Sequence, residues 1–150
     1  MIYLATDHAG FELKAKIKEY LIKKGYEVED FGAKTLDEDD DYPDFISQAA
    51  EAVSKNSDAK AIILGGSGQG EAMVANKFPN IRAAVYYGGQ ANMPSLTREH
   101  NNANVLSLGA RFISEEDAID AVKLFLETPF SNGERHIRRI EKIKQLEKSL

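Results

Sequence analysis

The chain has 150 residues, of which 43% are hydrophobic and 29% charged, and its 19 basic and 24 acidic side chains give a net charge of −5. This length suits one domain, residues 1–150, with room for a sizeable core. The acidic balance argues against nucleic acid or an anionic membrane as the main partner. Because cysteine is absent, disulfides, thiolate metal sites and cysteine catalysis are all excluded.

The N-terminal sequence gives no sign of export. Residues 1–5 lack the basic flank and long apolar run of a signal peptide. No stretch approaches the ~18 apolar residues that span a bilayer. We therefore expect a soluble, cytoplasmic protein.

Short apolar runs alternate with helical periodicity along the whole chain. Strands are predicted over residues 2–6, 27–31, 61–64, 82–87 and 105–108. Helices are predicted over residues 11–24, 71–76, 95–101 and 134–150, from Pro43 onward, and from Ser114 to about Glu127. This alternation predicts an α/β fold with a five-stranded parallel sheet covered on both faces.

Several helix ends carry recognisable signals. Ser114, with Asp117 three residues later, resembles a capping box, and Gly25 is placed to end the first helix. Pro43 is suited to the first turn of its helix. The buried face of that helix is predicted to carry the stripe Ile46, Ala49, Ala50 and Val53.

Four glycines cluster in the segment 65–70, between a predicted strand and a predicted helix, where α/β proteins bind ligands. A Walker A loop would need lysine where Glu71 stands, and the dinucleotide fingerprint and the nucleophile elbow around Ser67 also fail. A carboxylate beside backbone N–H donors suits proton abstraction next to a carbonyl. The alternative is a tight turn followed by an ordinary first-turn glutamate, which the helix dipole favours.

Three histidines are candidates for imidazole chemistry. His8 follows the first predicted strand, His100 precedes the fifth, and His136 lies on the last predicted helix. The alternative for each is a structural histidine. Their wide separation predicts no metal site. The acidic run 37–41 lacks the spacing and the glycine of a calcium loop and is interpreted as solvated.

Three arginines are candidates for binding an anion. Arg111 directly follows the fifth strand, at a carboxyl end. Arg135 and Arg139 share a helix face beside a histidine, an arrangement that suits phosphate oxygens. The alternative for this pair is a solvated basic face.

The last predicted helix has an apolar stripe with no later element to cover it, formed by Ile137, Ile140, Ile143 and Leu146. This stripe predicts a homodimer. The alternative is that the helix packs back onto its own sheet.

Seven motifs occur in order along the chain: Asp7 to Gly10, Asp41 to Pro43, Gly65 to Glu71, Ala75 to Lys77, Arg98 to Asn102, Gly109 to Arg111 and Arg135 to Arg139. This ordered set resembles the type B ribose-5-phosphate isomerases and their relatives that isomerise galactose 6-phosphate or allose 6-phosphate. The resemblance implies a Rossmann-like three-layer α/β/α sandwich with an extended C-terminal helix. It also implies a cofactor-free enzyme that forms a homodimer or tetramer with shared active sites.

The resemblance also implies a role for each motif residue. Many members have a cysteine base where Gly65 stands, so this chain resembles the branch whose base is a glutamate, here Glu71. Ser67 would fix the substrate, and the backbone N–H groups of Gly68 and Gly70 would hold the enediolate oxygen.

The same resemblance implies how the rest of the sugar phosphate is bound. Asp7 and His100 would open the furanose ring. His8 and Arg111, with Arg135 and Arg139 of the partner subunit, would bind the phosphate. The other expected substrate-binding residues are Tyr42, Gly66, Asn101 and His136.

The sequence thus predicts interconversion of ribose 5-phosphate and ribulose 5-phosphate through an enediolate. One alternative is a hexose 6-phosphate substrate, because the segment 86–94 departs from the family pattern and precedes the helix that carries His100. Another is a sugar-phosphate-binding module without catalysis.

Overall fold

Five parallel strands form the centre of the molecule, in the spatial order β2-β1-β3-β5-β4. The computed structural model describes all 150 residues. The parallel sheet confirms the prediction from the alternating pattern. The strands are β1 (Ile2–Thr6), β2 (Val28–Asp30), β3 (Lys60–Gly65), β4 (Ala83–Tyr86) and β5 (Val105–Gly109).

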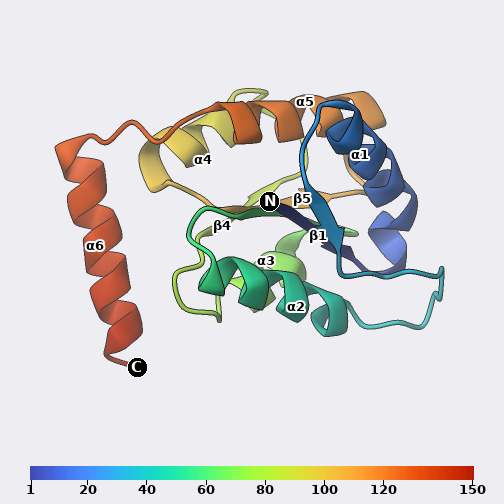
Figure 1. The fold of residues 1–150 in the computed structure, drawn as a ribbon, viewed down its shortest axis with the longest axis horizontal. Coiled ribbons are helices and arrows are strands. Elements are labelled where there is room, and N and C mark those ends of the chain that lie inside the picture. Colours follow the sequence, from blue (N-terminus) through green and yellow to red (C-terminus); the bar gives the residue numbers. More distant parts are fainter.

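Helices cover both faces of this sheet and give the predicted Rossmann-like three-layer arrangement. Figure 1 shows α1, α4 and α5 on one side and α2 and α3 on the other. None of the helices combines the length and the apolar character that a membrane span requires. The helices are η1 (His8–Gly10, a 3₁₀ turn), α1 (Phe11–Lys23), α2 (Tyr42–Lys55), α3 (Gln69–Ala75), α4 (Met93–Asn101), α5 (Glu115–Glu127) and α6 (Glu134–Lys148).

The central strands are apolar throughout because each of their faces is buried. In β1, Leu4 belongs to the hydrophobic cluster under α1 and α5, whereas Ala5 belongs to the cluster under α2 and α3. In β3, Ile62 and Ile63 are divided in the same way, and both are fully buried. Each such side chain stabilises the fold by roughly 1.5–3 kcal/mol through burial.

The predicted helix signals are confirmed. The Ser114 hydroxyl accepts a hydrogen bond from the Asp117 N–H (3.1 Å) at the start of α5. Gly25 has a φ of +87° just after α1, a conformation that glycine adopts without strain. The buried residues of α2 are the predicted Ile46, Ala49, Ala50 and Val53.

Several element bounds differ from the prediction. The helix after the glycine cluster begins at Gln69 rather than at residue 71, because Gly68 turns the chain through a left-handed conformation (φ +79°) straight into α3. The helix expected from residue 95 begins at Met93, with Pro94 in its first turn. Strand β4 is shorter at both ends than residues 82–87.

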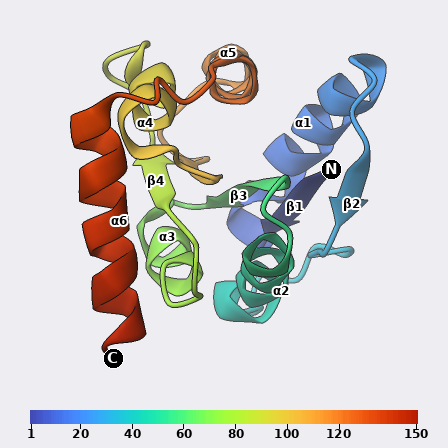
Figure 2. The ribbon, with the colours of Figure 1, turned by 60° about the vertical axis from the view of Figure 1, so that its left-hand side comes forward.

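Helix α6 stands beside the β4 edge of the sheet rather than over either face (Figures 1 and 2). It has no buried residue, and Ile137, Ile143 and Leu146 are 48%, 52% and 68% exposed. Its C-terminal turn is held by the Glu147 carboxylate, which accepts a hydrogen bond from the Asn80 N–H. The apolar stripe is therefore not covered by the sheet of its own chain.

Candidate active site

A cavity of about 490 Å³ lies at the carboxyl ends of the strands. Its position is the switch point of the sheet, because the chain leaves β1 toward β2 on one side and resumes at β3 on the other. The residues that line it are Asp7, His8, Ala9, Tyr42, Gly66, Ser67, Gly70, Glu71, Arg111 and Phe112. Eight of these are among the site residues predicted from the sequence.

Glu71 projects back from α3 over the end of β3. Its side chain is almost fully buried (4% exposed), and its carboxyl group fills the space that a Cβ on Gly65 would need. Burial raises the pKa of this carboxyl group, the charge of Asp7 raises it further, and the backbone N–H groups of Glu71 and Gly68 oppose the rise. A carboxyl group with a raised pKa beside a cavity is suited to proton transfer.

Two further glycines make room for side chains of the site. A Cβ on Gly66 would lie 3.0 Å from Nη1 and 3.3 Å from Cζ of Arg111, so glycine lets the guanidinium lie over the loop. A Cβ on Gly70 would overlap the Tyr42 hydroxyl. The glycine loop therefore admits an arginine and a tyrosine to the cavity at close range.

Gly68, a further predicted site residue, does not line the cavity of its own chain. A Cβ there would lie 3.1 Å from the Leu108 carbonyl carbon, so Gly68 packs against the end of β5. Its carbonyl accepts the Ser107 hydroxyl (2.7 Å), and its N–H acts on the Glu71 carboxylate. Gly68 thus joins the glycine loop to the end of β5.

Asp7 directly follows β1 and caps the N-terminus of the 3₁₀ turn. Its carboxylate accepts the Ala9 N–H (3.0 Å), and the residue is 6% exposed. The Thr6 hydroxyl donates to the Leu64 carbonyl (3.0 Å) and ties the ends of β1 and β3 together. Gly10 packs directly on Thr6, which sets the turn tightly against the sheet.

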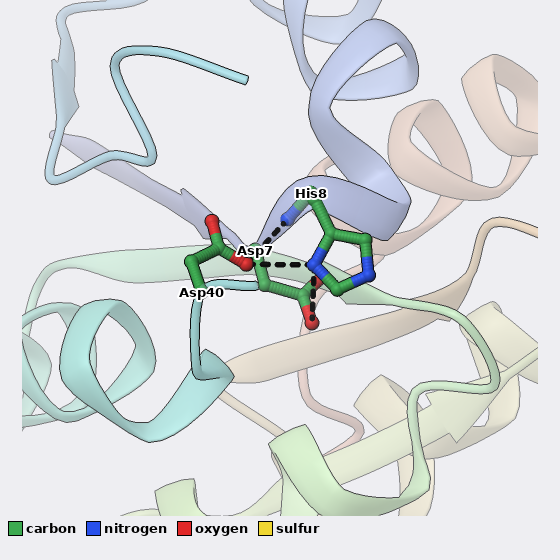
Figure 3. Close-up of side chains that lie close together, drawn as sticks. All are labelled: Asp7, His8 and Asp40. Atoms are coloured by element: carbon green, nitrogen blue, oxygen red, sulfur yellow. Dashed lines mark hydrogen bonds and ion pairs between the residues drawn. The ribbon is translucent and has the colours of Figure 1, made fainter. Parts of the chain in front are cut away.

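His8 pairs with Asp40, which belongs to the acidic run interpreted above as solvated. Its Nδ1 lies 2.7 Å from Oδ1 of Asp40, and its backbone N–H donates to the same oxygen (3.0 Å; Figure 3). The hydrogen bond with Asp40 raises the pKa of His8, as do the charges of Asp7 and Asp40, against burial and Arg111. The interpretation of residues 37–41 as a solvated loop is thus wrong for Asp40, whose side chain is 9% exposed.

Asp7, His8 and Asp40 are also the group best placed to hold a metal, since they offer ligand atoms within 4.8 Å of one another. The histidine nitrogen and the Asp40 oxygen that face each other are already hydrogen-bonded, and the Asp7 carboxylate binds a backbone N–H. The facing atoms of this cluster are thus engaged in hydrogen bonds within the protein.

Besides Gly68, five predicted site residues do not line the cavity of their own chain, and they lie on α4 and α6. The rings of His100 and His136 stack with their centroids 4.6 Å apart. Partial burial, His100 and the neighbouring arginines lower the pKa of His136. Within one chain Asp7 and His100 therefore do not form the expected pair. The five residues are His100, Asn101, Arg135, His136 and Arg139.

The segment 86–94, which departs from the family pattern, does not line the cavity of its own chain. Tyr87 does reach it indirectly, because its ring lies edge-on to Phe112, with centroids 5.9 Å apart. Phe112 is 63% exposed at the cavity and was missed from the sequence. Its position directly after Arg111, a predicted site residue, could have indicated that it lies near the cavity.

Comparison with known proteins identifies the family. The family model described as Ribose/Galactose Isomerase matches residues 2–143. The chain belongs to the ribose/galactose isomerase family. A relative named ribose-5-phosphate isomerase B from Mycobacterium tuberculosis is 42% identical over 148 residues, covering 99% of this chain and 90% of the relative.

Solved structures of this family match the whole chain closely. Ribose-5-phosphate isomerase B of Mycoplasma genitalium, solved with bound ribulose-5-phosphate, has a TM-score of 0.95 at 42% identity and covers 99% of this chain and 97% of that one. The enzyme from Clostridium thermocellum has a TM-score of 0.92 at 43% identity, with the same coverage. The family and the isomerase activity expected from the sequence motifs are thereby confirmed, and the chain is an enzyme.

Proposed function

We propose that this chain interconverts ribose 5-phosphate and ribulose 5-phosphate through an enediolate. The observation that carries the proposal is the buried Glu71 carboxyl group, held over Gly65 at a cavity of about 490 Å³. A relative that is 42% identical over nearly its full length holds ribulose-5-phosphate, which supports a pentose phosphate as substrate.

In this proposal Glu71 moves the proton between C2 and C1 of the open-chain sugar. The pKa of Glu71 is raised and so lies closer to neutral pH than that of an ordinary glutamate. A group that both accepts and donates a proton works best when its pKa is near the working pH. The Gly70 N–H and the Ser67 hydroxyl stabilise the enediolate oxygen, because both residues line the same cavity. Burial strengthens these interactions by excluding water.

The phosphate group binds to His8 and Arg111, which line the same cavity as Glu71. His8 and Arg111 supply positive charge from this chain, and a guanidinium matches phosphate oxygens in geometry as well as charge. Arg135 and Arg139 are exposed on α6 and are assigned to the phosphate of the partner subunit's site. Tyr42 lies along the sugar, over Gly70.

Ring opening uses Asp7 of one chain and His100 of the other in a homodimer. His100 is exposed on α4, next to the uncovered apolar face of α6, and His136 stacks on it. Joining two chains across α4 and α6 would bury the apolar surface of α6. It would also bring the predicted site residues of these helices, including Asn101 and His136, to the cavity of the partner chain.

An isomerase assay with matched variants tests this function. The wild-type chain should convert ribose 5-phosphate with a higher kcat/KM than allose 6-phosphate or galactose 6-phosphate. Glu71→Gln should lower kcat by ~10²–10⁴-fold, the usual contribution of a general base. Glu27→Gln, which makes the same charge change at an exposed site, should leave the rate unchanged.

Three results would contradict parts of this proposal. A preference for a hexose 6-phosphate would overturn the substrate, and full activity in Glu71→Gln would overturn the base. Absence of solvent deuterium exchange at C2 with every sugar phosphate tested would favour a binding module.

A further inference from the structure

We propose that Asp40 is a positioning residue that holds His8 by Nδ1, so that Nε2 serves as a hydrogen-bond donor to the phosphate end of the substrate. The inference deepens the proposed function and rests on it for the identity of the anion. Asp40 lies in the loop between β2 and α2, outside the residues that line the cavity. It therefore acts on the substrate only through His8.

A single oxygen of Asp40 fixes both the main chain and the ring of His8. Oδ1 accepts the His8 backbone N–H at 3.0 Å and faces Nδ1 at 2.7 Å. Figure 3 shows Nε2 on the side of the imidazole away from Asp40. Because both donors are held from one side, the ring is fixed with its second nitrogen left for a ligand.

The burial of Asp40 indicates that its interaction with His8 offsets an unfavourable desolvation. Its side chain is 9% exposed, and Oδ2 is buried without a hydrogen-bond partner. An unsatisfied buried carboxylate oxygen is unfavourable unless the rest of the group is strongly bound. Residues 34–39 and Asp41 are exposed, so within the segment 34–41 only Asp40 turns inward.

Hydrogen bonds within the loop turn Asp40 inward. The Asp37 carboxylate accepts the Asp39 N–H (3.0 Å), and the Asp37 carbonyl accepts the Asp40 N–H (3.1 Å). This turn places Asp39 in solvent and directs Asp40 toward β1. Asp39 is thus a natural control, because it has the same charge in the same run but no contact with His8.

The charges around His8 decide which protonation state faces the substrate. A neutral ring that donates from Nδ1 to Asp40 would present a lone pair at Nε2, which repels a phosphate oxygen. The pKa of His8 is raised, mainly by the hydrogen bond with Asp40 and then by the charges of Asp7 and Asp40, while burial and Arg111 oppose the rise. Asp40 thereby favours the imidazolium, whose Nε2–H attracts phosphate.

Comparison of Asp40→Asn with Asp39→Asn tests this role. Replacing the Asp40 carboxylate by an amide keeps the shape and an acceptor but removes the charge. We expect the pKa of His8, followed by NMR titration of its ring protons and assigned with His8→Gln, to fall in Asp40→Asn and to be unchanged in Asp39→Asn. We expect KM for ribose 5-phosphate to rise on the order of tenfold, as when a charge-assisted hydrogen bond is weakened, with kcat retained.

A double variant separates this role from a general effect on folding. In a His8→Gln background Asp40→Asn should add nothing to KM, because its effect passes through His8. An unchanged His8 pKa, or an equal rise in KM without His8, would overturn the proposal. If Asp40→Asn does not fold, Asp40→Ser provides the same comparison. Because the NMR titration needs no turnover, it remains informative if ribose 5-phosphate proves not to be a substrate.

Discussion

The Glu71 carboxyl group occupies the space directly over the Cα of Gly65, where any side chain at position 65 would have to lie. The family resemblance places a cysteine base at that position in many members. A thiol at position 65 and a carboxylate from position 71 would therefore put the catalytic base in the same space. Because the two groups would overlap, a chain can hold only one of them there. Glycine at position 65 is therefore what a carboxylate base at position 71 requires.

This overlap predicts the effect of a small side chain at position 65. Gly65→Ala should displace the Glu71 carboxylate and lower kcat by ~10²-fold or more, as expected for a misplaced general base. Gly10→Ala should unfold the end of β1 instead, because its Cβ would overlap Thr6 and Leu64. Urea unfolding and steady-state kinetics distinguish the two. Wild-type kcat in Gly65→Ala would contradict a base fixed over Gly65.

The same overlap predicts that a thiol at position 65 can replace the Glu71 carboxylate as the catalytic base. In the double variant Gly65→Cys with Glu71→Ala, the smaller residue at 71 makes room for the new thiol, and activity should exceed that of Glu71→Ala alone. Because the natural chain has no cysteine, iodoacetamide should abolish only this regained activity. The test is the rate before and after alkylation, and resistance to the reagent would show that the thiol is not the base.

The raised pKa of Glu71 predicts how activity and stability depend on pH. As a base the carboxylate must be ionised, so kcat/KM should fall as the pH drops through this raised pKa. The folded state binds the proton more tightly than the unfolded state, so stability from this group is present at low pH and is lost as the pH rises through the folded-state pKa.

Glu71→Gln should accordingly be more stable than the wild type at neutral pH, with the difference shrinking in acid. Thermal unfolding of both proteins across pH measures it. Glu27→Gln, at an exposed site, should show no such trend. A constant difference at every pH would mean that Glu71 is not the titrating group.

The buried pair Lys14–Asp30 predicts a large loss of stability when it is broken. Lys14 Nζ lies 2.7 Å from Asp30 and also donates to the Ala33 carbonyl (2.8 Å) at the start of the loop that carries Asp40. Burial disfavours the charge on both residues, and the pKa of Lys14 is lowered, but hydrogen bonds from Lys14 and Gly32 keep the pKa of Asp30 low.

Lys14→Met should therefore cost about 3–5 kcal/mol, the usual result of leaving one member of a buried pair alone. Lys18→Met is the matched control, because Lys18 reaches the same carboxylate at 3.4 Å but is exposed, and it should cost only about 0–1 kcal/mol. Equal urea midpoints for the two variants would contradict the burial argument.

Much of the fold could be predicted because its signals are local. The apolar runs, the Ser114 cap, the Gly25 turn and the stripe on α2 each depend on a few neighbouring residues, and all are confirmed. The start of α3 was missed because it depends on the left-handed conformation of Gly68. That conformation follows from packing against β5, which is distant in sequence.

The site was predictable where it follows directly from strand ends. His8, Ser67 and Arg111 each come just after a strand, and parallel strands bring their carboxyl ends together. Asp40 was not predictable, since an acidic run is typical of a solvated loop and its inward turn depends on Asp37. The stacking of His100 on His136 likewise depends on how α6 meets α4.

The proposed sharing of each active site between two chains predicts complementation between two inactive variants. In a dimer where Glu71 of one chain works with His100 of the other, co-expression of Glu71→Gln and His100→Asn gives mixed dimers with one site that carries both lesions and one site with neither. These dimers, isolated by two different affinity tags, should regain activity that neither homodimer has. If Glu71 and His100 served the same chain, every site would carry one lesion and the mixed dimers would stay inactive.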